Sequence, residues 1–190
     1  MPRKPNYDRD DLIARARDLF WQRGWAGTSL KDLEAELNMK PGSFYAAFGS
    51  KDALFALALE KYSNDGVARI TALSQEHGPL KALQMFPALM IENDEAPAKA
   101  CMLSKTLLEL QAHAHPLAEK ANEYFQKMEA LFADLFAQAQ ATGEITATSD
   151  PRQLACRYQS DLLGLRVTAE RGGTAARDIA AQIAQSIAQL

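Results

Sequence analysis

Two helix-ending signals close together constrain this chain more than any other feature of its sequence. In NMKPGSFYAAFGSKDALF, residues 38–55, Asn38 ends one helix and Pro41 suits the first position of the next. Gly49 ends that second helix after about two turns, and Ser50 can cap a further one. A hydrophobic core needs no helix this short, so we expect it to present its outer face to a partner.

The residues before this segment predict two more helices. Residues 10–23 carry apolar side chains on one face and are followed by Gly24, a typical helix stop. Ser29 can cap a second helix, with Asp32 at the capping-box position. Helix, tight turn and short helix form the helix-turn-helix pattern, whose second helix enters the major groove of DNA.

The rest of the chain has helical periodicity and no segment that alternates apolar and polar residues as a strand does. Hydrophobic residues make up 47% of the 190 residues, enough for a sizeable core. We therefore predict an all-α protein of about nine helices, with a DNA-binding domain at 1–50 and a larger helical domain at 51–190. Beyond the first three, the helices are expected at about 51–74, 80–92, 98–112, 116–141, 151–170 and 174–189.

Charge is divided unevenly along the chain. The formal net charge is −3, but residues 1–51 hold nine Lys or Arg and seven Asp or Glu, a net of +2. The acidic remainder does not favour nucleic acid, whereas the mildly basic N-terminal quarter permits contact with it. PRKP at residues 2–5 is either a basic arm that reaches DNA or a solvated tail.

The short helix should bury one side and expose the other. Phe44 and Phe48 are four residues apart, so they share a face and should pack against Leu19, Leu33 and Leu37. Small and polar side chains then remain for DNA, and Gly42, Ser43 and Ala46 would allow close approach to bases. Lys40 and Lys51 supply positive charge for phosphate, and the Tyr45 hydroxyl can donate a hydrogen bond to it.

Residues 24–55, GWAGTSLKDLEAELNMKPGSFYAAFGSKDALF, resemble the N-terminal domain of TetR-type (tetracycline-repressor-like) transcription regulators. The residues that match the family pattern are Thr28, Ser29, Gly42, Ser43, Phe44, Tyr45, Phe48, Ser50, Lys51, Leu54 and Phe55. Ala47 departs from it, since the family often has His there. The resemblance implies a ligand-binding and dimerisation domain after the DNA-binding domain. The expected DNA contacts are Thr28, Ser29, Lys40, Gly42, Ser43, Tyr45, Ala46 and Lys51.

Methionine and aromatic residues in the second half of the chain suggest a pocket. Methionine side chains adapt to ligands of varied shape, although the same residues also serve as ordinary core. We expect a small-molecule effector of unknown identity to bind among Met85, Met90, Met102, Phe125, Met128 and Tyr158.

Cys101 is a candidate redox sensor. The segment ACMLSKTLLEL resembles the start of the sixth helix in one branch of the family, where in some members a cysteine senses oxidants or electrophiles. A helix start favours the thiolate, and Lys99 or Lys105 could add to this effect. The alternative is a small buried hydrophobe. We expect Cys156 to lie in the core.

The last helix predicts how two copies could associate. A two-turn helix contacts few bases, so specificity requires two copies on successive major-groove turns. Ile179, Ile183 and Ile187 recur every four residues, and with Leu162 on the preceding helix they are expected to form a two-fold homodimer contact. Alternatively, this face packs only within its own chain.

No catalytic arrangement, cofactor motif or metal-ligand spacing is present, so we expect neither an enzyme nor a cofactor. No apolar run is long enough for a membrane span, and the N-terminus lacks a signal-peptide core, so a cytoplasmic protein is expected. We interpret the chain as a one-component regulator, a repressor that a small molecule releases from a palindromic operator. The alternatives are a thiol-based sensor using Cys101, an all-α adaptor without specific DNA binding, or a small helical enzyme.

Overall fold

The computed structural model describes residues 8–190. Within this range the chain forms nine α-helices, one 3₁₀ turn and no strand, which confirms the all-α prediction. The helices are α1 (Arg9–Arg23), α2 (Leu30–Glu36), α3 (Pro41–Phe48), α4 (Lys51–His77), α5 (Pro79–Glu92), α6 (Met102–Leu110), α7 (Pro116–Ala141), α8 (Pro151–Glu170) and α9 (Ala175–Ala188), with the 3₁₀ turn η1 (Gln111–His113) after α6.

Local sequence signals set the boundaries of the first helices, as predicted. The Ser29 hydroxyl accepts a hydrogen bond from the Asp32 backbone N–H, and the Asp32 carboxylate accepts one from the Ser29 N–H, so the capping box is complete. Asn38 takes a φ of 51° after α2, a conformation that Asn tolerates better than most residues. Gly49 ends α3 with a φ of 78°, where a side chain would be strained.

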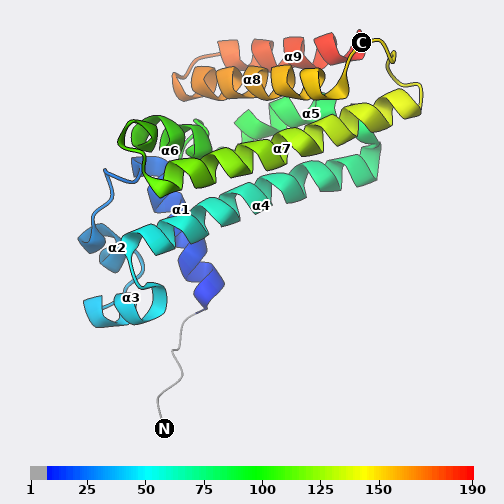
Figure 1. The fold of residues 1–190 in the computed structure, drawn as a ribbon. Coiled ribbons are helices and arrows are strands. Elements are labelled where there is room, and N and C mark those ends of the chain that lie inside the picture. Colours follow the sequence, from blue (N-terminus) through cyan, green and yellow to red (C-terminus); the bar gives the residue numbers. More distant parts are fainter. Residues whose placement is uncertain (1–7) are drawn as a thin grey trace.

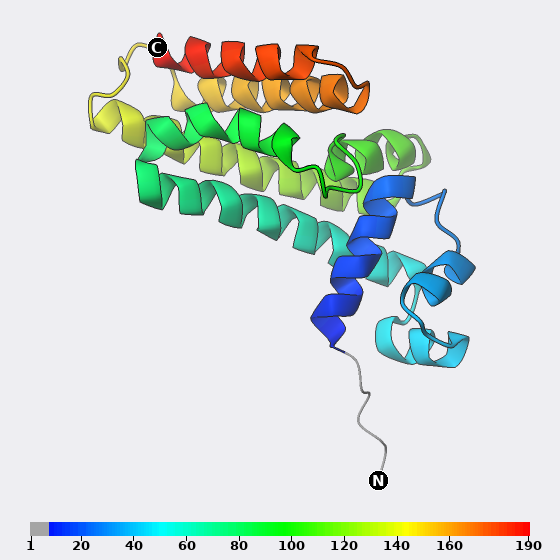
Figure 2. The ribbon, with the colours of Figure 1, turned by 180° about the vertical axis from the view of Figure 1, so that it is seen from behind.

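The molecule has two hydrophobic clusters at opposite ends of α4. Figure 1 shows α1, α2 and α3 gathered around the start of α4, with α5, α8 and α9 stacked beyond its far half. The first cluster joins α1–α3 to the start of α4, to α6 and to the start of α7; the second joins α5, α8 and α9 to the rest of α4 and α7. Seen from behind, α1 crosses α4 (Figure 2). The two halves of the molecule therefore share long helices.

Helix α6 begins later than the sequence predicts, at Met102 instead of near residue 98. The backbone N–H groups of Lys99 and Ala100 both donate to the Glu170 carboxylate, at 2.5 and 2.7 Å. Lys99 Nζ in turn donates to the Ile91 and Asn93 carbonyl oxygens at the end of α5. These contacts hold residues 98–101 in a non-helical connection instead of a first helical turn.

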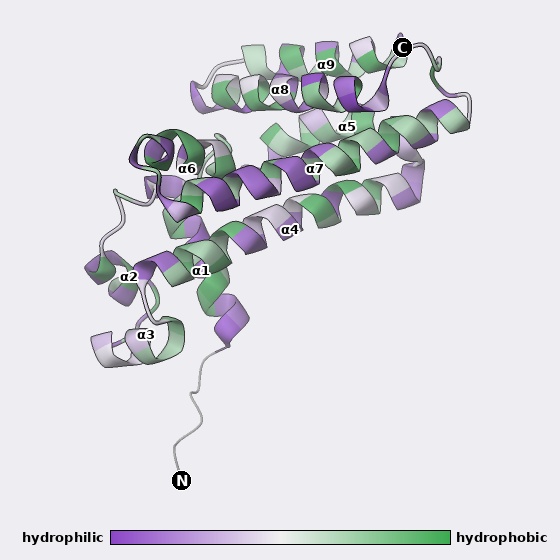
Figure 3. Ribbon diagram, viewed as in Figure 1, coloured by the Kyte–Doolittle hydropathy of each residue, from purple (hydrophilic) through white to green (hydrophobic). Residues whose placement is uncertain are grey.

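The long helices are amphipathic. In Figure 3 hydrophobic and hydrophilic residues alternate around the ribbons of α4, α7 and α8. Each of these helices buries one stripe and exposes the opposite side to solvent. Across the described part of the chain, no helix combines the length and the apolar character that crossing a bilayer requires.

Candidate DNA-binding face and effector cavity

Helix α3 exposes the face that the sequence predicts. Phe44 and Phe48 are buried at 0% and 6% exposure and lie in one cluster with Leu19, Leu33 and Leu37. Tyr45, the residue after Phe44, is 49% exposed at the edge of this buried face. The other exposed candidates for DNA contact on and beside α3 are Ser29, Lys40, Gly42, Ser43 and Ala46.

Two residues that were expected to contact DNA, Thr28 and Lys51, form contacts within the protein instead. Thr28 is fully buried, and its hydroxyl donates to the Gly24 carbonyl oxygen at 2.7 Å. Lys51 Nζ donates to the carbonyl oxygens of Trp25 and Thr28, at 2.9 and 3.1 Å, and lies 3.9 Å from the Trp25 ring centroid. In this structure both side chains hold the connection between α1 and α2 in place.

Arg9 is an exposed basic residue beside α3 that the sequence analysis did not single out. Its Nη1 donates to the Ala47 carbonyl oxygen at 2.7 Å, and its guanidinium lies 5.1 Å from the centroid of the Phe48 ring. The contact places a positive charge at the C-terminal end of α3. The PRKP segment at residues 2–5 lies outside the described residues.

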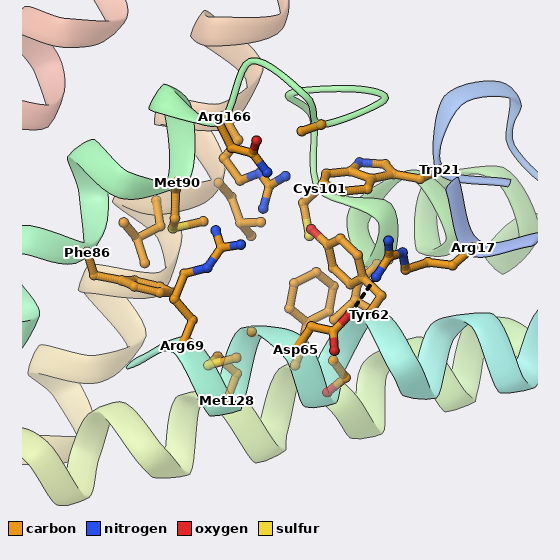
Figure 4. Close-up of a pocket in the computed structure, with 18 of the residues that line it drawn as sticks. Arg17, Trp21, Tyr62, Asp65, Arg69, Phe86, Met90, Cys101, Met128 and Arg166 are labelled. Carbon is orange, nitrogen blue, oxygen red and sulfur yellow. Dashed lines mark hydrogen bonds and ion pairs between the residues drawn. The ribbon is translucent and has the colours of Figure 1, made fainter. Parts of the chain in front are cut away.

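A cavity of about 330 Å³ lies where the two halves of the molecule meet (Figure 4). Its wall comes from α1, α4, α5, α6, α7 and α8 and from the connection between α5 and α6. Three of the six residues expected to bind a ligand are in the wall: Met90, Phe125 and Met128. Met85, Met102 and Tyr158 are not, and the Tyr158 hydroxyl donates to the Leu83 carbonyl oxygen at 2.7 Å within the core.

The cavity wall carries several polar groups. Arg17 forms ion pairs with Asp65 and Asp18, at 2.5 and 2.6 Å. Arg166 donates through Nε to the Lys99 carbonyl oxygen at 2.6 Å. The hydroxyl oxygens of Tyr62 and Ser63 are buried and have no hydrogen-bond partner among the described residues. Burial raises the pKa of the Tyr62 hydroxyl far above its ordinary value; Cys101 raises it further, and the positive charge of Arg166 lowers it by less, so this group stays neutral.

The two cysteines differ in environment. Cys101 is 7% exposed, lines the cavity and occupies the position that caps the N-terminus of α6. Figure 4 shows it beside Tyr62 and Trp21. Cys156 is exposed on α8, so the expectation that it lies in the core was wrong. It occupies the outer side of α8, opposite the stripe that contains Tyr158 and Leu162.

Helix α6 connects the cavity to the end of α1. The Glu109 carboxylate accepts hydrogen bonds from the backbone N–H groups of Trp25 and Ala26, at 3.0 and 2.7 Å. Lys105 Nζ donates to the Trp21 and Gln22 carbonyl oxygens, at 2.6 and 3.0 Å. The same helix begins directly after Cys101 in the cavity wall, so a movement there can reach α1.

The residues expected at a dimer contact are mostly internal. Leu162, Ile183 and Ile187 are 3–7% exposed in the single chain and belong to its second cluster, and Ile179 packs against that cluster. Helix α9 lies against α5 and α8 of its own chain. Ile183 and Ile187 on α9 are therefore core residues of their own chain, and Ile179 is partly exposed.

Comparisons with known proteins agree with this architecture. The sequence model described as "Bacterial regulatory proteins, tetR family" matches residues 12–58. The model described as "Tetracyclin repressor-like, C-terminal domain" matches residues 79–185, more than half of the chain. The two matched segments cover the helix-turn-helix and nearly all of α5–α9.

Individual relatives are similar over most of their length. The HTH-type transcriptional repressor ComR of Escherichia coli (strain K12) is 28% identical over 88% of this chain and 82% of its own length. A cysteine mutant of the TetR family transcriptional regulator CifR, complexed with 26bp double-strand operator DNA, is 27% identical with a TM-score of 0.82, covering 97% of both chains. A TetR family regulator from Cytophaga hutchinsonii shares the fold at 22% identity, with a TM-score of 0.84 over 95% of this chain and 92% of that one. The chain therefore belongs to the tetR family of bacterial regulatory proteins and is a DNA-binding transcription regulator.

Proposed function

We propose that this regulator is a repressor that binds its operator as a homodimer and releases it when a small molecule enters the cavity. In this proposal residues 1–50 form the DNA-binding domain and residues 51–190 bind the effector and dimerise. Ser29, Lys40, Gly42, Ser43, Tyr45 and Ala46 contact DNA, with Lys40 and Tyr45 directed to phosphate. The operator is palindromic because a two-fold dimer presents two copies of α3 to it.

The observation that supports effector control is that part of the cavity wall belongs to the DNA-binding domain. Arg17, Asp18 and Trp21 in that wall belong to α1, the first helix of the DNA-binding domain. A ligand in the cavity therefore contacts the DNA-binding domain directly. A ligand that fits only one orientation of α1 shifts the population toward that orientation, which is all that effector control requires.

Helix α6 supplies a second route. It holds the end of α1 through Glu109 and Lys105, and its first turn follows Cys101 in the cavity wall. Ligand contact near Cys101 would therefore displace the residues that fix the start of the helix-turn-helix. Both routes change the spacing of the two α3 helices in the dimer, and that spacing decides whether both fit successive major grooves.

Filling the cavity with a side chain tests this proposal without a known effector. Met90→Trp places an indole in the cavity and should lower affinity for the duplex found upstream of the protein's own gene, measured by fluorescence anisotropy. Leu108→Trp is the control, because Leu108 is 82% exposed on α6 and lies outside the cavity. Phe125→Trp repeats the test from α7, and circular dichroism checks that each variant is folded. Unchanged operator affinity in both folded cavity variants would contradict effector control through this cavity.

A second candidate function is thiol sensing, favoured by the position of Cys101. Its side chain lines the same cavity, at the N-terminus of α6, where a molecule in the cavity can reach the sulfur. An electrophile that enters the cavity would then form a covalent bond to Cys101 and act as the effector. Cys101→Ser should abolish operator release by N-ethylmaleimide while keeping affinity for DNA. Equal release from both proteins would exclude Cys101 as the sensor.

A further inference from the structure

We propose that the effector of this regulator is an acid, with an anionic head group bound by Arg166, Tyr62 and Ser63 and an apolar body in the rest of the cavity. This inference rests on the proposed function, because it names the chemical class of the molecule that the cavity takes. Three observations carry it, and they concern charge, hydrogen bonding and the apolar wall.

The first observation is a buried arginine without an acidic partner. Arg166 is 8% exposed and lines the cavity from α8. Its Nε donates to a backbone carbonyl oxygen, and its guanidinium lies 5.4 Å from the Trp21 ring centroid and 5.9 Å from that of Tyr62. No carboxylate among residues 8–190 lies within 4.0 Å of it. A buried charge is costly unless it is paired, so this guanidinium favours an anion in the cavity.

The carboxylates of Asp65 and Glu170 already have other partners. Asp65 binds Arg17 and Lys61, so its charge is neutralised on the α1 side of the cavity. Glu170, one turn after Arg166, accepts the two backbone N–H groups of Lys99 and Ala100. A second guanidinium, that of Arg69 on α4, extends into the same cavity (Figure 4). Three carboxylates also line the cavity: Asp18 and Asp65 pair with Arg17, and the exposed Glu95 forms no ion pair with Arg166 among the described residues. Arg166 therefore has no counter-ion in the part of the wall that the structure describes.

The second observation is a pair of unused hydrogen-bond donors. Tyr62 Oη and Ser63 Oγ, on adjacent residues of α4, are buried and have no partner among the described residues. Buried hydroxyl groups in native proteins almost always have a partner, so these two face a position where water or the head group of a ligand supplies acceptors. Because burial keeps the Tyr62 hydroxyl neutral, it can donate a hydrogen bond to an anion.

The third observation is the apolar remainder of the wall. The apolar side chains that line the cavity include Phe86, Met90, Phe125, Met128, Phe132 and Leu162. At about 330 Å³ the cavity is near the lower end of volumes for small-molecule sites. An inorganic anion would leave this apolar wall unfilled, and a neutral hydrocarbon would leave Arg166 unpaired. An alkyl or aryl-alkyl carboxylate satisfies both parts of the wall.

Matched acids and amides test the head group directly. Octanoate, 3-phenylpropanoate and 2-naphthylacetate are each compared with their primary amides, which keep the shape and lose the charge. Binding to the full chain without DNA is measured by isothermal titration calorimetry at pH 7.5. We expect at least one acid to bind about tenfold or more tighter than its amide. In Arg166→Gln this preference should fall to about twofold or less.

Two further variants separate ligand binding from folding. Tyr62→Phe and Ser63→Ala remove hydroxyl groups that have no partner in the free protein, so they should leave its melting temperature unchanged or raise it. The same variants should weaken binding of the acid several-fold, because they remove donors to its head group. The matched control for Arg166→Gln is Arg157→Gln, since Arg157 lies on the same helix but its side chain is 82% exposed and outside the cavity.

The inference is overturned if no acid in the panel binds tighter than its amide, or if Arg166→Gln keeps the preference. Operator release is measured separately, by fluorescence anisotropy with the same acid. An acid that binds through Arg166 and does not release the operator would contradict the proposed effector control and leave the ligand class standing.

Discussion

The Glu109 carboxylate accepts a hydrogen bond from the Trp25 backbone N–H at 3.0 Å, and through it α6 caps the connection that leads into the helix-turn-helix. Its second oxygen accepts the Ala26 N–H, and Lys105, one turn earlier on α6, neutralises the C-terminal end of α1. One face of α6 therefore binds carbonyl acceptors at the end of α1 and N–H donors of the connection that follows it. This arrangement makes α6 a stiff link between the cavity and the DNA-binding face.

Replacing Glu109 should loosen this link. Glu109→Ala removes the acceptor of two backbone N–H groups and should lower the free energy of unfolding by about 1 kcal/mol. It should also weaken the effect of the cavity-filling Met90→Trp change on operator affinity, because the displacement no longer reaches α1. Operator affinity is measured for both single variants and the double variant, with the exposed Glu123→Ala as the control. Full additivity of Glu109→Ala and Met90→Trp would contradict the link.

Lys40 and Tyr45 should contact phosphate. Lys40→Ala should weaken binding to operator and unrelated duplexes by similar factors, because phosphate contacts carry no sequence information. It should also lower the slope of log affinity against log salt by about one unit for each half of the dimer. Tyr45→Phe should weaken binding to both duplexes without changing the salt slope. Lys81→Ala is the matched control, because Lys81 is an exposed residue of α5, far from α3. A change in sequence preference in Lys40→Ala would instead place Lys40 against a base.

Lys51 should behave differently from Lys40, although both are lysines of the helix-turn-helix. Its Nζ binds two carbonyl oxygens of the α1–α2 connection, so Lys51→Met should destabilise the protein by about 1 kcal/mol. Any loss of DNA affinity should then follow the loss of stability, with the salt slope unchanged. Thermal unfolding and a salt titration decide the matter. A reduced salt slope with an unchanged melting temperature would show that Lys51 contacts phosphate.

The helices could be predicted because their signals are local. The Ser29–Asp32 capping box, Asn38 and Gly49 each act within one turn of the helix end that they set. The start of α6 could not be predicted from such signals. It depends on Glu170, which accepts backbone N–H groups 70 and 71 residues away.

The cavity could be predicted only in part, because hydrophobic periodicity shows which face is buried and not what lies inside. Met90 and Met128 face the cavity while Met102 fills the core, yet all three lie on apolar stripes. Arg166 was missed although its signal is in the sequence. It lies four residues after Leu162 on the buried stripe of α8, where a charged side chain is rare unless it has a partner. The sequence could not show whether the isoleucine face of α9 packs within its own chain or against a second chain. Packing on α5 and packing on a second chain require the same apolar pattern.

Asp32 should make the DNA-binding domain acid-sensitive. Hydrogen bonds from the Ser29 hydroxyl and backbone, with a smaller contribution from Arg23, hold the pKa of Asp32 below its ordinary value of 3.8. A lowered pKa in the folded state stabilises the protein above pH 3.8, and this stabilisation disappears as the pH falls through the folded-state pKa. Asp32→Asn should therefore lower the melting temperature at pH 7 and have a smaller effect near pH 3. Asp134→Asn on α7, exposed and without an ion pair among the described residues, is the control. An equal effect of Asp32→Asn at both pH values would show that the charge of Asp32 contributes nothing to stability.

The outer face of α8 is the remaining candidate for the dimer contact, because the isoleucines of α9 are internal. Cys156, Ser160, Gly164 and Val167 recur at intervals of three or four residues and are all exposed. Val167 is 53% exposed, one of the few large hydrophobic side chains in the described chain that is open to solvent. The small side chains before it would allow a second α8 to approach closely, as in helix bundles that join two helices from each chain.

Charge on this face should separate the two chains without unfolding either. Gly164→Arg and Val167→Arg each place an arginine against its own copy across a two-fold axis, where like charges repel. Each variant should sediment as a monomer and keep the helical circular dichroism of the parent. Operator affinity should fall toward that for unrelated DNA, because one α3 helix contacts too few bases for specificity. Gln182→Arg, on the exposed side of α9, adds the same charge on the neighbouring helix. Folded Gly164→Arg and Val167→Arg proteins that still sediment as dimers would exclude the outer face of α8 as the dimer contact.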